Sequence, residues 1–206
     1  MMITLIIVVF LPQRIQYKQP PKQLTIATFP RALGQYDSTT HLMLDGHKWH
    51  AYSITLLDQH PILENHRIDK SLEYVWVRKM KGFSFLYSIY SYQRVLIVCT
   101  GSDIVPVLGY IKEPSPTTHI HLLWSGEHYE QNYGEYIWEL VQKTSPNFTL
   151  HDTSTNGQLN SQLIEYHVLN TDTEAVFILS NEEFTNEMMN IFWRKGIDCF
   201  GGLLDS

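Results

Sequence analysis

One uninterrupted apolar run limits the possible folds of this chain more than any other feature. Residues Arg94–Cys99 read Arg-Val-Leu-Ile-Val-Cys, with no polar position after the first, and Thr100-Gly-Ser follows at once. A strand that is apolar on both faces needs cover on both sides, which is typical of a central strand in a parallel sheet. The run therefore predicts an α/β fold in which helices cover both faces of the sheet.

Three later segments repeat this character. They are Ile120–Trp124, Phe148–His151 and Ala175–Leu179. Apolar residues recur at helical spacing between them, in two sets: Ile137, Leu140 and Val141, and Leu159, Leu163 and Tyr166. Strands that alternate with helices predict a Rossmann-like parallel sheet, here with four strands.

The helix expected after Ala175–Leu179 has the clearest limits. Ser180 or Asn181 can cap its first turn, and Gly196 can take the left-handed conformation that closes it. One apolar stripe along this helix is expected to face the core: Phe184, Met188 and Ile191.

The first half of the chain has a different pattern. Short β-branched or aromatic runs alternate with turn residues between Arg14 and Thr55. A polar stretch, residues 58–71, predicts a loop before another strand at Leu72–Val77. We expect an abbreviated, antiparallel, β-barrel-like unit over residues 1–92 and the parallel-sheet domain over residues 93–206.

The chain starts with an apolar run, Met1–Leu11. A membrane-spanning helix needs roughly 20 such residues, so this run does not form a complete one. It lacks the basic start and small-residue end of a signal peptide. Three alternatives stay open: an edge strand, the stub of a membrane helix from a longer relative, or a poorly ordered start. The second would allow membrane association.

Charge and cysteine content exclude several classes of function. Fifteen basic and 21 acidic residues give a formal charge of -6, so no nucleic-acid partner is expected. Cys99 and Cys199 lie far apart, which fits a reducing, cytoplasmic compartment or the cytoplasmic face of a membrane. His47 and His50 would chelate only across a turn, and no metal site is expected.

The turn after Cys99 is the best candidate for a binding site. Gly101 lets a ligand approach the backbone, and the hydroxyls of Thr100 and Ser102 can donate hydrogen bonds to a phosphate. Pro106 fits the first turn of a following helix. These residues predict a pyrophosphate site, although an ordinary connection between strand and helix could use the same glycine.

Residues 100–106, Thr-Gly-Ser-Asp-Ile-Val-Pro, resemble the Thr-Gly-Ser-Gly-Ile-Gly-Pro loop of the ferredoxin-NADP reductase superfamily. The likeness is most specific to the flavin reductase-like region of certain fungal and plant proteins, some of them membrane proteins and some with an adenylate-forming domain. Further marks of the resemblance follow in order to the end of the chain: Trp124-Ser125, Tyr133-Gly134, residues 151–153, residues 177–181, residues 194–197 and residues 200–206.

The resemblance implies two cofactors, FAD and NAD(P)H. Residues 48–54 resemble the element that meets the flavin, with Trp49, His50, Tyr52 and Ser53 as the cofactor-binding residues. Tyr52 would stack on the flavin ring while Ser53 bonds to its edge. The alternative is an amphipathic strand whose aromatic residues pack on a small barrel.

The resemblance also assigns roles near the chain end. Phe200, Asp205 and Ser206 would close the nicotinamide face, with Ser206 and Cys199 as the candidate catalytic residues. Burial of Cys199 as a core strand residue is the alternative. Glu127, after the second strand, favours NADH over NADPH, because an NADP site usually places an arginine there.

Two departures from the family pattern weaken the expected cofactor sites. Asp103 and Val105 stand where relatives have small residues, and a carboxylate at this position repels a diphosphate. Residues 54–74 lack the turn that faces the flavin phosphates in relatives.

We expect an oxidoreductase of the ferredoxin reductase type that passes hydride between NAD(P)H and FAD, with an unknown electron acceptor. The alternative is a non-catalytic relative that keeps the fold, has lost its cofactors and serves as a binding module or depends on a partner.

Overall fold

The computed structural model describes the chain in segments. These are residues 10–14, 16–17, 25–28, 38–43, 49–53, 61–64, 74–83, 85–108, 110, 116–144 and 147–203. Side chains are described from Phe85 onward, apart from those of residues 136, 144 and 203.

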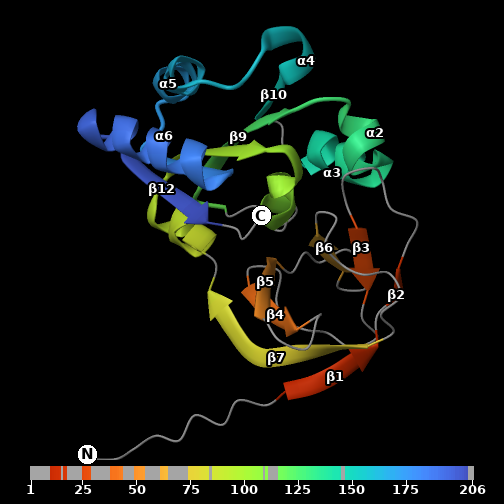
Figure 1. Ribbon diagram of the computed structural model, residues 1–206. Coiled ribbons are helices and arrows are strands. Elements are labelled where there is room, and N and C mark those ends of the chain that lie inside the picture. Colours follow the sequence, from red (N-terminus) through yellow and green to blue (C-terminus); the bar gives the residue numbers. More distant parts are fainter. Residues whose placement is uncertain are drawn as a thin grey trace, which may run out of the picture.

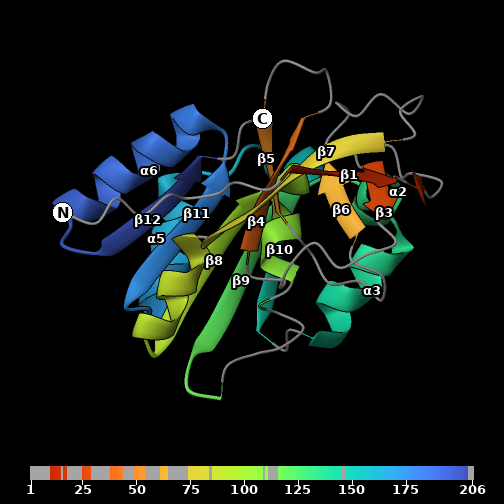
Figure 2. The same ribbon diagram turned by 90° about the horizontal axis from the view of Figure 1, so that it is seen from below.

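A parallel sheet of five strands forms the centre of the C-terminal part (Figure 1). Its strands are β8 (Arg94–Thr100), β9 (His119–Gly126), β10 (Phe148–Asp152), β11 (Ala175–Ser180) and β12 (Asp198–Leu203). They lie side by side in the order β10-β9-β8-β11-β12, as Figure 2 shows from below. The α/β class and the four expected strands are confirmed.

The fifth strand, β12, corrects the expected strand count. Its sequence is Asp-Cys-Phe-Gly-Gly-Leu, which lacks the continuous apolar run of the other strands. The glycines have a packing reason. A Cβ atom on Gly202 would come within 2.1 Å of the Phe85 ring, so this ring lies directly on the strand backbone.

Alternate residues of β8 enter two separate cores, one on each face of the sheet. Val95, Ile97 and Cys99 belong to the first core. Leu96 and Val98 belong to the second. All five side chains are at most 1% exposed, which confirms that β8 is buried on both faces.

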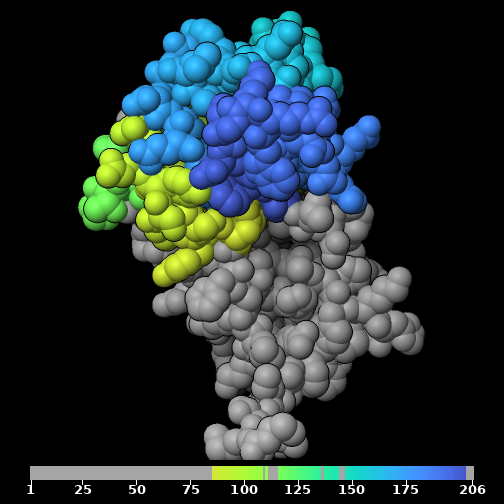
Figure 3. Space-filling model, turned by 90° about the vertical axis from the view of Figure 1, so that its left-hand side faces the viewer, coloured from red at the N-terminus to blue at the C-terminus, as the bar shows by residue number. Residues whose placement is uncertain are grey.

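Helices and 3₁₀ segments cover both faces. The first core is covered by η1 (Phe85–Ser91), η2 (Gly101–Val107), α2 (Tyr129–Tyr133) and α3 (Glu135–Thr144). The second is covered by α5 (Ser161–Asn170) and α6 (Glu182–Arg194), while the short α4 (Thr153–Asn156) follows β10. Figure 3 shows the C-terminal part of the chain, in blue, beside the yellow-green segment that begins at Phe85.

The limits of α6 agree with expectation. The Asn181 side chain accepts a hydrogen bond from the Phe184 amide at 2.9 Å, and Gly196 has a φ of +75°. In α5 the expected stripe is wrong. Leu159 precedes the helix and Tyr166 is 61% exposed, whereas Ile164 and Val168 are the buried residues.

The N-terminal strands pair antiparallel in two sheets, in the orders β1-β7-β4-β5 and β2-β3-β6. Their bounds are β1 (Phe10–Arg14), β2 (Gln16–Tyr17), β3 (Thr25–Thr28), β4 (Ser38–Met43), β5 (Trp49–Ser53), β6 (Pro61–Glu64) and β7 (Tyr74–Phe83). Strand β6 lies inside the polar stretch that was expected to be a loop, which corrects that expectation. The barrel-like closure of this unit stays a prediction.

Among the helices in the described residues, none combines the length and the apolar character that crossing a bilayer requires.

Candidate functional site

The turn after β8 is the first component of the site. Thr100 ends the strand in an extended conformation, and Gly101 opens η2 with a φ of +53°, in the left-handed region that favours glycine. The Thr100 side chain makes no capping hydrogen bond to η2. Pro106 lies late in η2 rather than in its first turn, which corrects its expected position.

An aromatic cluster beneath this turn holds the glycine in place. The indole Nε1 of Trp124 donates a hydrogen bond to the Gly101 carbonyl oxygen at 2.9 Å. Trp124 is 0% exposed, and the rings of Tyr129 and Tyr133 lie 4.7 Å and 5.1 Å from its ring centre. The position of the β8 turn is therefore fixed by residues of the neighbouring strand and of α2.

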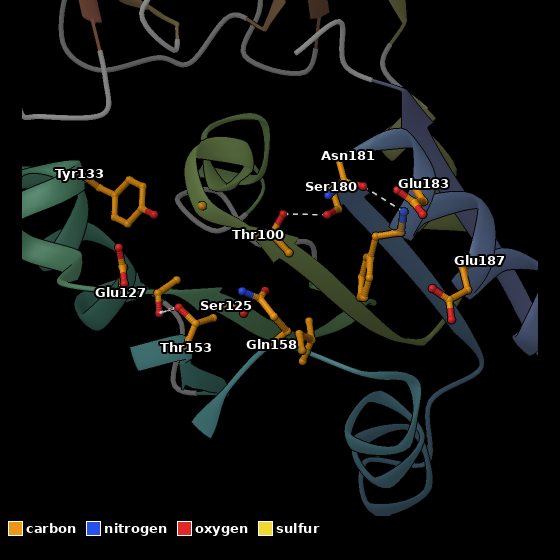
Figure 4. Close-up of a pocket in the computed structure, with 14 residues that line it drawn as sticks. Thr100, Ser125, Glu127, Tyr133, Thr153, Gln158, Ser180, Asn181, Glu183 and Glu187 are labelled. Carbon is orange, nitrogen blue, oxygen red and sulfur yellow. Dashed lines mark hydrogen bonds between the residues drawn. The ribbon is translucent and has the colours of Figure 1, made fainter. Parts of the chain in front are cut away.

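A pocket of about 540 Å³ opens beside this turn, where the carboxyl ends of the parallel strands meet (Figure 4). It lies at the point where the strand order reverses, between β8 and β11, the usual ligand position in open α/β sheets. The residues that line it come from the strands β8, β9 and β11, from η2, α2, α4 and α6, and from the intervening loops: Thr100, Gly101, Ser125, Gly126, Glu127, Tyr133, Thr153, Gln158, Leu159, Ser180, Asn181, Glu183, Phe184 and Glu187.

The charge of the pocket wall is entirely acidic. Glu127 contributes one carboxylate beside β9, and Glu183 and Glu187 contribute two from α6. No lysine or arginine occurs among the residues described as lining it. The part of the wall that carries these carboxylates therefore favours neutral hydroxyl or amide groups of a ligand over negatively charged phosphate groups.

Two hydroxyls and a carboxyl group form a hydrogen-bonded chain at the pocket floor. The Thr100 Oγ1 lies 2.7 Å from the Ser180 Oγ of the adjacent strand. The same Thr100 hydroxyl donates to the Asp103 Oδ2 at 3.5 Å. Asp103 is thus not in the pocket wall, but contacts it through Thr100.

Burial dominates the ionisation of Asp103. Removal from water raises the pKa of its carboxyl group to about 6, although the hydrogen bond from Thr100 acts in the opposite direction. Asp103 therefore changes charge near neutral pH, where an ordinary aspartate is fully ionised.

Tyr133 places a phenol between the two glycine-containing turns. Its Oη lies 3.6 Å and 3.2 Å from the positions that a Cβ on Gly101 and Gly126 would occupy. Burial raises the Tyr133 pKa to about 12, and the carboxyl group of Glu127 adds to the shift. The hydroxyl therefore stays protonated and can donate a hydrogen bond into the pocket.

Three of the predicted cofactor residues meet at this pocket: Thr100, Gly101 and Glu127. Ser102 and Pro106 do not line it. Tyr133, Ser180 and Glu183 also line the pocket, although none of them was predicted as a ligand contact. The position of two of them was a usable signal, since Ser180 ends a strand and Glu183 lies in the first turn of the helix after it.

None of the other predicted residues is among those described as lining the pocket. Cys199 is 0% exposed in the second core, and burial raises the pKa of its thiol to about 12. These surroundings favour the alternative, a core strand residue, over a catalytic thiol. Phe200 stacks on Phe177 at 5.0 Å in the first core. Asp205 and Ser206 lie outside the described residues. The flavin candidates Trp49, His50, Tyr52 and Ser53 form β5, and their side chains are not described.

His121 of β9 packs against its neighbours in the sheet and in α5. His121 Nε2 lies 3.0 Å from the Thr149 hydroxyl of β10, and its ring stacks on His167 of α5 at 5.5 Å. The described residues contain no group of three side chains that could hold a metal ion.

Sequence comparison places residues 85–206 in one family model, described as the C-terminal domain of adenylate-forming reductase 03009. Adenylate-forming reductase 03009 of Coprinopsis cinerea is 25% identical over 133 residues, which are 64% of this chain and 13% of that protein. Adenylate-forming reductase 06235 of the same fungus is 25% identical over 134 residues, with the same coverage. The chain thus spans about an eighth of these curated relatives.

Solved structures share the fold over nearly the whole chain. Flavohemoglobin from Malassezia yamatoensis, with bound FAD and heme, has a TM-score of 0.69 at 13% identity, covering 95% of this chain and 60% of that one. Ferredoxin-NADP+ reductase from Plasmodium falciparum with 2'P-AMP has a TM-score of 0.68 at 12% identity, covering 94% and 96%. At these identities the likeness establishes the fold alone.

Proposed function

The chain belongs to the family of the adenylate-forming reductase 03009 C-terminal domain, and from this premise we propose that it binds a nicotinamide dinucleotide in the pocket between β8 and β11. The single observation that carries the proposal is the position of the pocket. It lies at the carboxyl edge of the parallel sheet, where the strand order reverses, with the Gly101 turn as one wall.

Two surfaces of the pocket would bind different parts of the dinucleotide. The Gly101 turn and the hydroxyls of Thr100 and Ser180 would face the pyrophosphate, because a glycine permits close approach of the backbone. Glu127 would accept hydrogen bonds from a ribose diol at the end of β9. The Tyr133 hydroxyl, between these two surfaces, would donate to either group.

The acidic wall supports a preference for NADH. A 2'-phosphate adds about 1.5 to 2 negative charges near neutral pH. Glu127, Glu183 and Glu187 would repel that charge, and no basic side chain among the described lining residues offsets them. NADPH would therefore bind more weakly than NADH.

The wider activity that we propose is hydride transfer between this nucleotide and FAD, with residues 1–92 as the flavin unit and residues 93–206 as the nucleotide domain. When bound, the nicotinamide would supply the hydride and the flavin would accept it. Family resemblance assigns Trp49, His50, Tyr52 and Ser53 of β5 to the flavin.

Matched variants of two glycines test the pocket. Gly101 and Gly196 both have positive φ, so alanine at either position strains the backbone. Only Gly101 lines the pocket. We expect Gly101→Ala to weaken binding of ADP-ribose at least about tenfold, while Gly196→Ala binds like the parent chain. Equal binding by both variants would contradict the proposed pocket.

A second pair of variants tests nucleotide preference. Glu127→Gln is expected to narrow the affinity ratio between NADH and NADPH, measured by titration calorimetry. Glu130→Gln, a change of the same chemistry at an exposed residue outside the pocket, should leave the ratio unchanged.

The flavin step has its own test. Protein purified with added FAD should be yellow, and NADH should bleach the colour in the absence of oxygen. A colourless protein that binds ADP-ribose but not FAD would favour the alternative, a relative that keeps the nucleotide domain without hydride transfer.

A further inference from the structure

We propose that Asp103 controls the pocket through a hydroxyl relay: its protonation state reverses the direction of the hydrogen bonds Asp103–Thr100–Ser180, and thereby decides whether Ser180 offers the pocket a proton or a lone pair. This inference rests on the proposed nucleotide site. It adds a residue outside the pocket wall that determines which ligand groups the wall accepts.

Each hydroxyl in the relay has only one proton to give. When Asp103 is ionised it can only accept, so the Thr100 hydroxyl donates to it across 3.5 Å. Ser180 must then donate to the Thr100 oxygen across 2.7 Å. The Ser180 oxygen consequently turns lone pairs toward the pocket, which repel a phosphate oxygen.

Protonation of Asp103 by water reverses the order. The carboxylic acid can donate to the Thr100 oxygen, Thr100 can donate to Ser180, and the Ser180 proton becomes available to the pocket. Both geometries use the same two contacts, and the Thr100–Ser180 distance allows either atom to be the donor. Binding of a pyrophosphate would therefore favour uptake of one proton at Asp103.

The groups around Asp103 leave it as the titrating member near neutral pH. Burial raises the pKa of the Asp103 carboxyl to about 6. Burial raises the pKa values of Cys99, on β8, and of Tyr133, on α2, and the Asp103 charge raises both further. Tyr133, at about 12, stays neutral where Asp103 titrates. The other charged groups described around the pocket, Glu127, Glu183 and Glu187, are all acids.

Titration calorimetry of the full chain with ADP-ribose tests the relay between pH 5 and pH 8. ADP-ribose is the right probe because its two linked phosphates titrate far below this range, whereas adenosine serves as a probe without phosphate. Above the Asp103 midpoint, affinity for ADP-ribose should fall by up to about tenfold per pH unit, while adenosine binding stays flat. A flat ADP-ribose profile would overturn the relay.

Three variants separate the relay from simple charge repulsion. Asp103→Asn should bind ADP-ribose tightly at every pH, because the amide can donate to Thr100. Ser180→Ala keeps the Asp103 charge but removes the pocket end of the relay, so its pH dependence should largely disappear. Asp152→Asn, at the same sheet edge but outside the pocket, should behave like the parent chain. Full pH dependence in Ser180→Ala would show direct repulsion and overturn the relay.

The carboxyl ¹³C signal of Asp103 gives a readout that needs no nucleotide. We expect its midpoint near pH 6, and a shift of that midpoint in Thr100→Val and in Ser180→Ala. An unshifted midpoint in both variants would overturn the relay even if nucleotides bind. Conversely, shifted midpoints with no ADP-ribose binding in any variant would support the relay and refute the proposed function.

Discussion

The turns after β8 and β10 each carry an aspartate at the same edge of the sheet, and the two carboxyl groups have opposite surroundings. Asp152 accepts hydrogen bonds from the Ser154 amide at 2.9 Å and from the Ser154 hydroxyl at 2.6 Å, which lower its pKa. Asp103 is half-buried, and desolvation raises its pKa to about 6. The ionised form of Asp152 is stabilised by hydrogen bonds within its own turn, whereas the ionised form of Asp103 is destabilised by desolvation.

This difference shows how each turn is held. The β10 turn is closed locally, because its aspartate caps the helix that follows. The β8 turn has no side-chain cap and depends instead on Trp124, which binds the Gly101 carbonyl from the next strand. Because the turn is held from outside, the Thr100 hydroxyl does not cap η2 and bonds instead to Ser180 and Asp103.

The largest expected effect comes from removing that outside support. Trp124→Phe deletes the indole donor to Gly101 and leaves a cavity in the first core, which should lower the free energy of unfolding by about 3 kcal/mol. Urea denaturation measures it. Trp193→Phe is the matched control, because Trp193 also donates to a backbone carbonyl, that of Cys199, but is 56% exposed. Equal losses would show that the β8 turn needs no outside support.

The next effect depends on pH and concerns Asp103. Because its folded pKa is raised, its favourable contribution is complete below about pH 4 and is lost as the pH rises through about 6. Asp103→Asn should therefore raise the free energy of unfolding by about 2 kcal/mol at pH 8 and change it little at pH 4. Stabilisation of equal size at both pH values would point to packing rather than charge.

A smaller effect is expected at a locally capped turn. Asn181→Ala removes the side-chain acceptor for the Phe184 amide at the start of α6, and should cost about 1 kcal/mol in thermal or urea unfolding. Asn160→Ala, which removes the corresponding cap of α5, should cost a similar amount. A much larger loss at Asn181 would mean that the residue supports more than its own helix.

The smallest effect should come from Asp152→Asn, since asparagine also caps helices well. Asp152 has a lowered pKa, so its contribution is present above about pH 4 and is lost as the pH falls through its folded value. The variant should unfold like the parent chain at acid pH and slightly more easily at pH 7. This sign is opposite to that for Asp103, and the same sign in both variants would contradict the comparison.

Much of the parallel sheet could be predicted, because β8 and β11 are continuous apolar runs, which are typical of strands buried on both faces of a sheet. Asn181 and Gly196 also marked the ends of α6 correctly. Strand β12 could not be found in this way, since Gly201 and Gly202 are selected by the groups that pack on them, such as the Phe85 ring, and not by strand propensity.

The pocket was predictable only in part for a similar reason. Thr100 and Gly101 stand in a recognisable turn, and Glu127 follows a strand. Ser180 joins them only because β11 lies beside β8, a pairing between segments about 80 residues apart that local patterns do not contain. The surroundings of Asp103 were equally hidden, because the direction of its carboxyl group depends on packing.

The pairing of β8 with β11 also has a consequence for how the molecule folds. Strands β8, β9 and β10 follow one another along the chain and form one side of the sheet, but β11 must return to the opposite side of β8. A partly folded chain that contains only the first three strands has no second wall for the pocket. Ligand binding would therefore report the late, long-range step of folding, and a fluorescent nucleotide analogue could time it in a refolding experiment.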